Sequence, residues 1–399
     1  MKNNTNSPFA EAAYNTNPYA TYAAMLKETP VYKTVLPNGV EVYVVTRYQD
    51  VQAGLKDARL VKNIRNARPE SLSGQAGPAM VNAGNMLKAD PPEHTRLRSL
   101  TNEAFKPKYI NQMRGHIEEI ANQLLDKVQS ADKMDMITDF AFPLPITIIS
   151  EMMGVPNHDH QKFGKWSSDL ITSGILSSEN PMSGKEFMEL GGYVRGLVDE
   201  HRKHPREDII SQLINAEENG DQLNDMEVMT TIILLLIAGH ETTVNLIGNG
   251  MLALLQQPAQ LEKLKQQPTL IKPAVEEMLR YVNPVQFVNR YAVEDIEVGG
   301  EKIPRGAHVL LALAAADHDP EFAPDPEKLN ITRDEARHLA FGQGIHYCVG
   351  APLARLEGEI AFTAILKRMP NIRLAVAPDQ LKWRPTLELR GLQSLPVTF

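Results

Sequence analysis

Three things that the chain has little of narrow the class of protein. It contains one cysteine in 399 residues, which excludes an internal disulfide and a zinc site built from several cysteines. Its longest aliphatic run, residues 232–238, is far shorter than the roughly 18 residues that indicate a membrane span. Positive charge is not in excess, because 41 basic residues face 49 acidic ones, and the net charge of -8 argues against nucleic-acid binding. The polar start MKNNTNSPFA lacks the apolar segment of a signal peptide, so we expect a cytoplasmic protein.

The residues that are present predict a folded, mainly helical protein. Hydrophobic residues make up 43% of the chain and no linker rich in glycine, serine or charge divides it, so we expect one domain over residues 1–399. β-branched residues after the turn signal Pro37-Asn38-Gly39 predict a strand over residues 40–46. Beyond about residue 92 the hydrophobic spacing is mostly helical. It predicts helices over residues 111–128, 209–216, 272–281 and 351–368, with extended segments at 288–293 and 309–313.

The strongest predicted helix covers residues 225–257 and contains a polar segment that packing does not explain. Asn224 and Glu227 have the spacing of a capping box, and Pro258 follows the last residue. At 1.5 Å per residue the helix would be roughly 50 Å long, and its apolar run predicts burial at the centre of the protein. The polar segment begins at His240. It is not the zinc motif H-E-x-x-H, because the fourth position after His240 is Val244.

The single cysteine lies in a loop of ten residues, Phe341 to Gly350, that reads FGQGIHYCVG and precedes the last predicted helix. Glycines in such a loop permit positive φ and a close approach of the backbone to a flat ligand. The free N–H groups at the start of the following helix favour a thiolate at Cys348 over a thiol. A lone cysteine is otherwise more often buried and inert. A dinucleotide-binding G-x-G-x-x-G is excluded, because Tyr347 stands three positions after Gly344.

This loop resembles the haem-binding loop of the cytochrome P-450 superfamily, with its aromatic residue, glycines, basic residue and cysteine in the same order. AGHET at residues 238–242 is similar to the oxygen-binding groove in the superfamily's long central helix. The sequence Glu277-Met278-Leu279-Arg280 matches its E-x-x-R motif. The resemblance extends over essentially the whole chain and is greatest to the soluble bacterial branch. It implies a mainly α fold with a minor β portion and a long central helix over the haem.

The resemblance also implies heme b (protoporphyrin IX iron) as the cofactor. Cys348 would be the axial ligand of the iron, within a loop completed by Phe341, Gly342 and Gly350. In this superfamily a cysteine thiolate in that position pushes electron density toward the iron and favours O–O cleavage. Two buried haem propionates need cationic partners. By resemblance these partners are His94, Arg98, Arg290 and His346, although each taken singly also fits a solvated surface charge.

Glu277 and Arg280 are expected to form a structural ion pair behind the haem. Residues three apart share one face of a helix, and a carboxylate with a guanidinium makes a charge-assisted pair. The motif alone also fits an exposed helix pair. The superfamily's third member of this network is an arginine, but the aligned position here is Lys328, and an ammonium replaces a forked guanidinium poorly. Arg333 is close in sequence, so the third partner is either Lys328 or Arg333.

In the central helix, the resemblance assigns proton delivery to Glu241 and Thr242, an acid followed by a hydroxyl. Gly239 would leave the space over the iron free of a side chain. The alternative for this polar segment is hydrogen bonding between helices in a buried seam.

Substrate contacts are implied by family position at residues 80–87, 170–176, 233–237, 285–288 and Leu392. Most of these residues are apolar, which suits a lipophilic small molecule, and a plain core role is an equal alternative. The residues singled out as the substrate pocket are Leu234, Ala238, Val285, Phe287, Val288 and Leu392.

The resemblance therefore implies a monooxygenase that inserts one oxygen atom from dioxygen into a lipophilic substrate by hydroxylation or epoxidation. With its one cysteine committed, the chain has no iron-sulfur segment of its own, so electrons would come from a separate ferredoxin or flavodoxin with its reductase. The basic residues Arg98, Lys106, Lys108 and Arg114 are candidates for its docking face, or a solvated helix face. The rival functions are a peroxide-driven peroxygenase of the same fold and a haem sensor or carrier without turnover.

Overall fold

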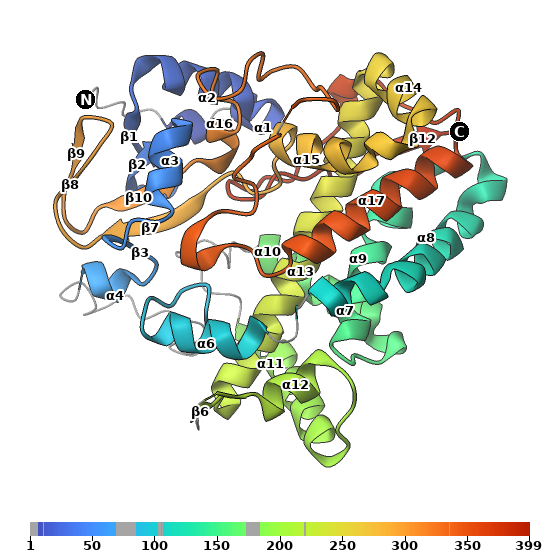
Figure 1. Ribbon diagram of the computed structural model, residues 1–399, viewed down its shortest axis with the longest axis horizontal. Helices are drawn as coiled ribbons and strands as arrows, with labels where there is room; N and C mark the ends of the chain where they lie inside the picture. Colours follow the sequence, from blue (N-terminus) through green and yellow to red (C-terminus); the bar gives the residue numbers. More distant parts are fainter. Residues whose placement is uncertain are drawn as a thin grey trace.

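A large helical region and a smaller region around a mixed sheet lie side by side in the computed structural model of the protein (Figure 1). The structure describes residues 7–10, 12–68, 85–102, 105, 107–172, 184–218, 221–334 and 336–399. Expected pocket residues 80–84 and 173–176 lie outside the described residues, as do Lys106 and the side chains of Lys108 and of residues 170–172.

The central helix α13 (Asp225–Gln256) crosses the whole helical region (Figure 1). Its capping box forms as predicted: the Glu227 N–H donates to Asn224 Oδ1 at 3.0 Å, and the Asn224 N–H donates to Glu227 Oε2 at 2.9 Å. The helix ends one residue earlier than expected, before Pro258 opens α14 (Pro258–Gln266). It is long and apolar enough to cross a membrane by composition alone, but 78% of its most apolar window is buried in the protein, as in a core helix.

Two further helices hold the motifs on either side of α13. The last helix, α17 (Ala351–Arg368), has the predicted bounds and packs against α8, α13 and α15. The E-x-x-R helix is α15 (Ile271–Tyr281), one residue longer than predicted. The remaining helices of this region are α6 (Glu93–Asn102), α7 (Pro107–Gln112), α8 (Arg114–Val128), α9 (Pro143–Met152), α10 (His160–Thr172), α11 (Gly184–Lys203) and α12 (Ile209–Asn215).

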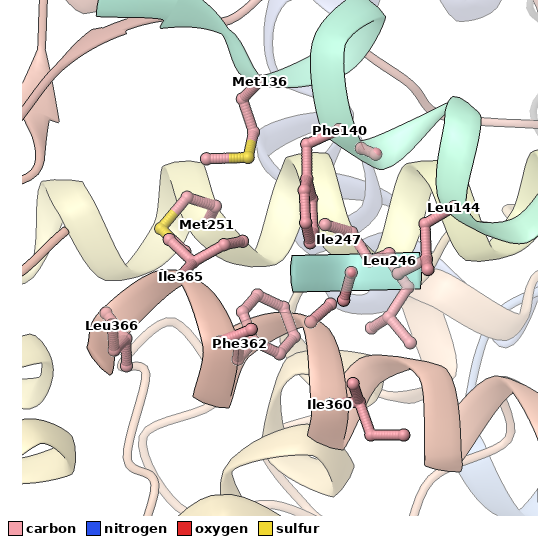
Figure 2. Close-up of a cluster of buried hydrophobic side chains, with 14 of the residues drawn as sticks. Met136, Phe140, Leu144, Leu246, Ile247, Met251, Ile360, Phe362, Ile365 and Leu366 are labelled. Atoms are coloured by element: carbon pink, nitrogen blue, oxygen red, sulfur yellow. The ribbon is translucent and has the colours of Figure 1, made fainter. Parts of the chain in front are cut away.

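The core between α13, α17 and the short helical segment η5 (Ile137–Ala141) is formed by aliphatic, methionine and phenylalanine side chains (Figure 2). Phe362 of α17, Ile247 of α13 and Phe140 of η5 are fully buried there. Gly250 allows α13 and α17 to approach, because a Cβ atom at this position would lie 2.8 Å from Phe362 Cζ. This packing holds α17, whose first turn follows the cysteine loop, against the C-terminal half of α13.

The sheet combines strands from both ends of the chain in the order β1-β2-β10-β7-β3. β2 (Glu41–Val45) confirms the strand predicted over residues 40–46 and is one residue shorter at each end; it pairs antiparallel with β1 (Val31–Val35), and Gly39 in the turn between them has a φ of 89°. β10 (His308–Leu311) pairs parallel with β2 and antiparallel with β7 (Val288–Ala292), which pairs in turn with β3 (Leu60–Val61). Joining distant strands in this way places the loop before β7 beside the helical region.

Two expected elements were wrong by more than one residue. The extended segment predicted over residues 309–313 ends at Leu311, and Leu313 begins the short helix α16 (Leu313–Ala316), because its alanines favour helix. The helix predicted over 111–128 is interrupted near Met113, which is the N-cap of α8. Its preceding turns belong to α7, which opens at a proline suited to a helix start.

Candidate active site

The loop that carries Cys348 depends on its first two glycines. Gly342 and Gly344 have φ of 65° and 73°, values that L side chains rarely adopt. A Cβ atom at Gly344 would also come within 2.9 Å of the Leu55 carbonyl oxygen. The Cys348 N–H donates to the Phe341 carbonyl oxygen at 3.0 Å, which closes the loop immediately before α17 begins. Gly350 has a negative φ of -83°, so it is not needed for backbone conformation.

The surroundings of Cys348 suit a metal thiolate more than a free one. Burial raises the pKa of the thiol, while the backbone N–H groups of Gly350 and Ala351 and the guanidinium of Arg98 act in the opposite direction. These donors stabilise negative charge at Sγ, as expected at the start of a helix. Because its pKa is raised, Cys348 favours the protonated thiol while no metal is bound. It gives up this proton when a metal binds, since metal binding and deprotonation are coupled.

The E-x-x-R pair is fully buried and bidentate. Arg280 Nε donates to Glu277 Oε2 at 2.8 Å, and Arg280 Nη2 donates to Glu277 Oε1 at 2.9 Å. The third partner is Arg333, whose Nε lies 3.1 Å from Glu277 Oε2. Lys328 contributes only its carbonyl oxygen to both guanidinium groups, while its ammonium group pairs with Asp325 at the surface. The forked guanidinium therefore occupies the third position.

A second ion cluster, which the sequence did not predict, links the cysteine loop to α15 and α17. Arg355 of α17 donates to Glu276 of α15 from Nε and Nη2, at 2.7 and 2.9 Å. His338, at the beginning of the loop segment, lies 3.1 Å from the same carboxylate. Although burial acts against it, the hydrogen bonds from His338 and Arg355 lower the pKa of Glu276 to about 2. The Arg355 guanidinium also lies 4.5 Å over the ring of Phe341, so the cluster holds the cysteine loop against α15 and α17.

The four cations assigned to the haem propionates come together, and Lys62 joins them. The rings of His94 and His346 are 4.2 Å apart, and Arg98 Nη2 donates to the Tyr347 carbonyl oxygen at 2.7 Å. Burial and the charges of Lys62 and Arg290 lower the pKa of His346 to about 2. Burial lowers the pKa of Arg290 to about 10, and Arg290 is 2% exposed.

The positive charges in this group oppose protonation of its members, above all of His346, more than the nearby acids Asp90 and Glu388 compensate. Asp90 opposes the shift at Arg290, but its oxygens already accept the backbone N–H groups of Lys62 and Asn63 at 2.8 and 3.0 Å. Burial, together with Arg290, lowers the pKa of Lys62 well below its usual range. A cluster of this kind fits a ligand with two carboxylates, which would restore the balance of charge.

On α13, one strip is open in the middle of an otherwise buried helix. Ala238 is exposed and Gly239 and Thr242 are half-buried, whereas Leu236 and Thr243 are buried. Thr242 Oγ1 donates to the Ala238 carbonyl oxygen at 3.0 Å. The structure gives Gly239 a different reason from the expected one: a Cβ atom there would lie 3.2 Å from Ile149 Cγ1. Glycine at this position therefore allows contact between α13 and α9.

Glu241 and Thr242 are adjacent in sequence but have different partners. Glu241 is 1% exposed, and Arg384 Nη1 donates a hydrogen bond to its Oε1. Consecutive residues on a helix point in different directions, so the acid faces Arg384 while the hydroxyl bonds its own helix. Arg384 is 143 residues away in sequence, and no spacing rule signals this pair.

The six expected pocket residues divide among different hydrophobic clusters. Leu234 and Val285 share one with Leu389, which the sequence did not single out and which forms a β-bridge with Val285. Val288 packs on the sheet cluster. Phe287 does not join them: it packs edge-on against Phe9 and Tyr22 in an N-terminal aromatic cluster, at ring distances of 5.4 and 5.8 Å.

Leu392, which is 1% exposed, packs in the main helical core and not in the cluster that contains Leu234 and Val285. Ala238 is the exposed residue on the α13 strip. Of the expected docking residues, Arg114 pairs with Glu359 at 2.9 Å, and Arg98 is half-buried beside the cysteine loop. The structure therefore brings together only some of the residues predicted for the substrate pocket and for the docking face.

A flat, doubly anionic cofactor whose metal takes a thiolate accounts for the loop, the cations and the open helix strip together. These residues fit haem: Cys348 would bind the iron, and Arg98, Arg290 and the two histidines would face the propionates. The site therefore defines the class as a haem-thiolate oxygenase.

The chain belongs to the cytochrome P450 family, whose sequence model, described as Cytochrome P450, matches residues 11–371. It is 44% identical over 393 residues to the Polyketide biosynthesis cytochrome P450 PksS of Bacillus subtilis, covering 97% of this chain and 96% of the relative. It is 42% identical over 388 residues to the Cytochrome P450 monooxygenase PikC of Streptomyces venezuelae, covering 96% and 91%.

Solved structures are equally similar. The chain resembles that of the Bacillus subtilis bacillaene polyketide synthase cytochrome P450 PksS with a TM-score of 0.91 at 42% identity, covering 99% of both chains. It resembles P450BioI in complex with hexadec-9Z-enoic acid ligated acyl carrier protein with a TM-score of 0.89 at 40% identity, covering 97% of this chain and 100% of the other. The predicted fold, enzyme class and haem b cofactor are confirmed.

Proposed function

We propose that this cytochrome P450 uses dioxygen and two electrons from a separate ferredoxin or flavodoxin, with its reductase, to hydroxylate or epoxidise a lipophilic small molecule. When bound, haem supplies the activation of dioxygen, favoured by the Cys348 thiolate. The observation that carries the proposal is the open strip of α13 at Ala238 and Thr242, in the middle of a helix that is otherwise buried. Haem itself would cover part of this strip, but the Thr242 hydroxyl on it and the adjacent Glu241 carboxyl are proton donors for oxygen activation, which a carrier or electron-transfer protein does not need.

The residues around this strip have separate tasks. Arg98, Arg290, His94 and His346 would hold the two propionates when haem is bound. Thr242 presents a hydroxyl at the open strip, and the carboxyl group of Glu241, the preceding residue, is buried. Because the two side chains have different partners, a water molecule or a change of rotamer must connect them during turnover.

The substrate is expected to be apolar and of the size of a secondary metabolite. Leu234, four residues before Ala238 on α13, packs in one apolar cluster with Val285 and Leu389. Relatives named for polyketide biosynthesis and as 6-deoxyerythronolide B hydroxylase support a polyketide-like substrate. The solved relative with an acyl-carrier-protein ligand adds a second form in which the substrate is presented, as a carrier-bound thioester.

Two extensions of the proposal concern the chain as a whole. We expect a single domain over residues 1–399 and a cytoplasmic location, in line with the 78% burial of the one long apolar helix within the described residues. The electron donor would dock near Tyr347, which is 40% exposed beside Arg98 and directly precedes the ligand cysteine.

The decisive experiment is a ligand panel read by the spin-state shift of the haem spectrum, followed by turnover of the ligands that bind. Polyketide lactones, free fatty acids and acyl-carrier-protein thioesters are compared. Each binder is then incubated with dioxygen and a ferredoxin or flavodoxin chain, or with hydrogen peroxide alone. Product only with the electron chain supports the proposal. Product with peroxide alone would make the protein a peroxygenase, and binding without any product would make it a sensor or carrier.

A further inference from the structure

Two neighbouring side chains of α13 each leave one buried atom without a hydrogen-bond partner. They are His240 Nε2 and Glu241 Oε2, in side chains that are 0% and 1% exposed. The two atoms lie 3.9 Å apart. Buried polar atoms in native proteins are nearly always paired, so this pair of unpaired atoms points to an interaction between them.

The tautomer of His240 follows from its other nitrogen. Nδ1 lies 2.9 Å from the Leu236 carbonyl oxygen, one turn earlier on the same helix. A carbonyl oxygen can only accept, so Nδ1 carries the hydrogen. In a neutral ring Nε2 is then an acceptor without a proton. It faces Glu241 Oε2, which is also an acceptor when the carboxylate is ionised.

Two acceptors facing each other in a buried site are unfavourable, and a single proton between them removes the conflict. The other oxygen of the carboxylate is already engaged, because Oε1 accepts from Arg384 Nη1. Arg384 is always charged, so it keeps Oε1 as an acceptor and leaves Oε2 as the place for a proton. The 3.9 Å gap exceeds a normal hydrogen bond by about 1 Å, which a small change in the Glu241 side-chain torsions closes.

We propose that His240 is a positioning residue that shares one proton with Glu241, held between His240 Nε2 and Glu241 Oε2. The inference rests on the proposed role of Glu241 in proton delivery and names the partner that fixes which oxygen carries the proton. When Glu241 passes this proton toward the Thr242 side through water, Nε2 remains an acceptor. A proton from solvent, entering at the half-buried Arg384 end, returns to Oε2, so the ring is neutral before and after.

The groups around the ring are consistent with this arrangement. Burial lowers the pKa of His240, Glu241 acts to raise it and Arg384 acts to lower it. The edge of the ring meets Phe142 of the α9 side at 5.7 Å, an apolar contact that adds no charge. Burial is the largest of these influences, so the ring is neutral and its Nε2 is an acceptor.

The test compares two substitutions of His240 that distinguish the role of ring nitrogen Nδ1 from that of Nε2. His240→Asn keeps a donor near the Nδ1 position and removes the acceptor at Nε2. His240→Gln reaches the Nε2 position and offers an amide oxygen there. Thr231→Val is the matched control, because it removes another buried, unpartnered polar atom from the same helix. All variants are studied as the haem-loaded protein.

The first readout is the infrared carbonyl band of a protonated carboxyl group, assigned to Glu241 by its loss in Glu241→Gln. At neutral pH we expect the band in the parent, in Thr231→Val and in His240→Gln. In His240→Asn it should shift to higher frequency or vanish. An unchanged band in His240→Asn, or no Glu241 band in the parent, would overturn the shared proton.

The second readout is product formed per reductant consumed, measured against pH. His240→Asn should lower this coupling by roughly tenfold, a small part of the 10²–10⁴-fold typical of general acid–base groups, and His240→Gln should restore most of it. Coupling in Glu241→Gln equal to the parent would refute the proton-delivery role of Glu241, while the infrared band would still decide the shared proton. If coupling falls in Glu241→Gln while His240→Asn keeps normal coupling and a normal infrared band, the role of His240 is refuted and the role of Glu241 stands.

Discussion

Removing the third member of the E-x-x-R network should destabilise the protein far more when Arg333 is changed than when Lys328 is changed. Arg333 Nε lies 3.1 Å from the fully buried Glu277 carboxylate, and its Nη groups donate to three backbone carbonyl oxygens, including that of Pro324 at 2.7 Å. Breaking a buried ion pair costs about 3–5 kcal/mol. Because Arg280 still neutralises Glu277 in Arg333→Ala, we expect the lower end, about 3 kcal/mol.

Lys328 is the matched control, since family position alone would have chosen it. Its ammonium group pairs with Asp325 at 3.0 Å, but the two side chains are 73% and 69% exposed. Exposed pairs contribute about 0–1 kcal/mol, so Lys328→Ala should leave stability nearly unchanged. Arg333→Lys keeps a charge without the fork and should fall between the two variants.

The assay is thermal unfolding of the haem-loaded protein, followed by circular dichroism, with urea midpoints as a second measure. An entropy of unfolding of about 2.1 cal/mol/K per residue gives about 0.8 kcal/mol/K for the whole chain. A loss of about 3 kcal/mol then lowers Tm by about 4 °C for Arg333→Ala, against about 1 °C or less for Lys328→Ala. Equal shifts in the two variants would refute the assignment of Arg333 as the third partner.

Four further outcomes are expected. Cys348→Ser should abolish both the long-wavelength Soret band of the reduced carbonyl complex and substrate oxidation; retention of both would disprove ligation by Cys348. Arg290→Gln removes a cation that is 2% exposed, and should weaken haem retention in urea by about 3 kcal/mol, with unchanged retention as the contrary result. In Thr242→Ala, reductant consumption should persist while product falls and peroxide rises, whereas Thr243→Ala should behave like the parent. Equal coupling of reductant to product in the parent, Thr242→Ala and Thr243→Ala would contradict the placement of the hydroxyl. Burial raises the pKa of Glu357 to about 8, so between about pH 4.5 and 8 the folded state keeps a proton that the unfolded state has lost, and stability falls as pH rises through this range. Glu357→Gln should flatten this dependence of stability on pH, measured by urea titrations. An unchanged slope would show that Glu357 does not cause it.

Local patterns determined a large part of the fold. The capping box at Asn224 and Glu227 set the start of the central helix, and the prolines after α13 and the glycine turn at Gly39 set other boundaries. Such signals act within a few residues of the chain, where hydrogen bonding and allowed φ values depend on neighbours in sequence. The boundary near Met113 and the end of β10 were wrong although local signals were present: Pro107 suits the start of α7, and the alanines after Leu313 favour helix.

The pocket shows where local patterns stop being informative. Phe287 and Val288 are consecutive residues near the start of β7, and both were expected at the substrate. Side chains alternate between the two faces of a strand, so Phe287 packs against Phe9 and Tyr22 while Val288 packs on the other cluster. The apolar character of the segment was readable, but not the face on which each residue would lie.

What the sequence by itself determined was the chemistry: one cysteine in a glycine loop, an acid and a hydroxyl in a central helix, and an E-x-x-R pair. These depend on residue types at short, fixed spacings. The tertiary structure decided the partners: Arg333 instead of Lys328 on Glu277, Lys62 among the cations, and Arg384 on Glu241. Each of these contacts joins segments far apart in sequence or separated by an irregular loop. Their formation depends on the packing of α13, α15 and α17 around a shared core, which no local spacing encodes.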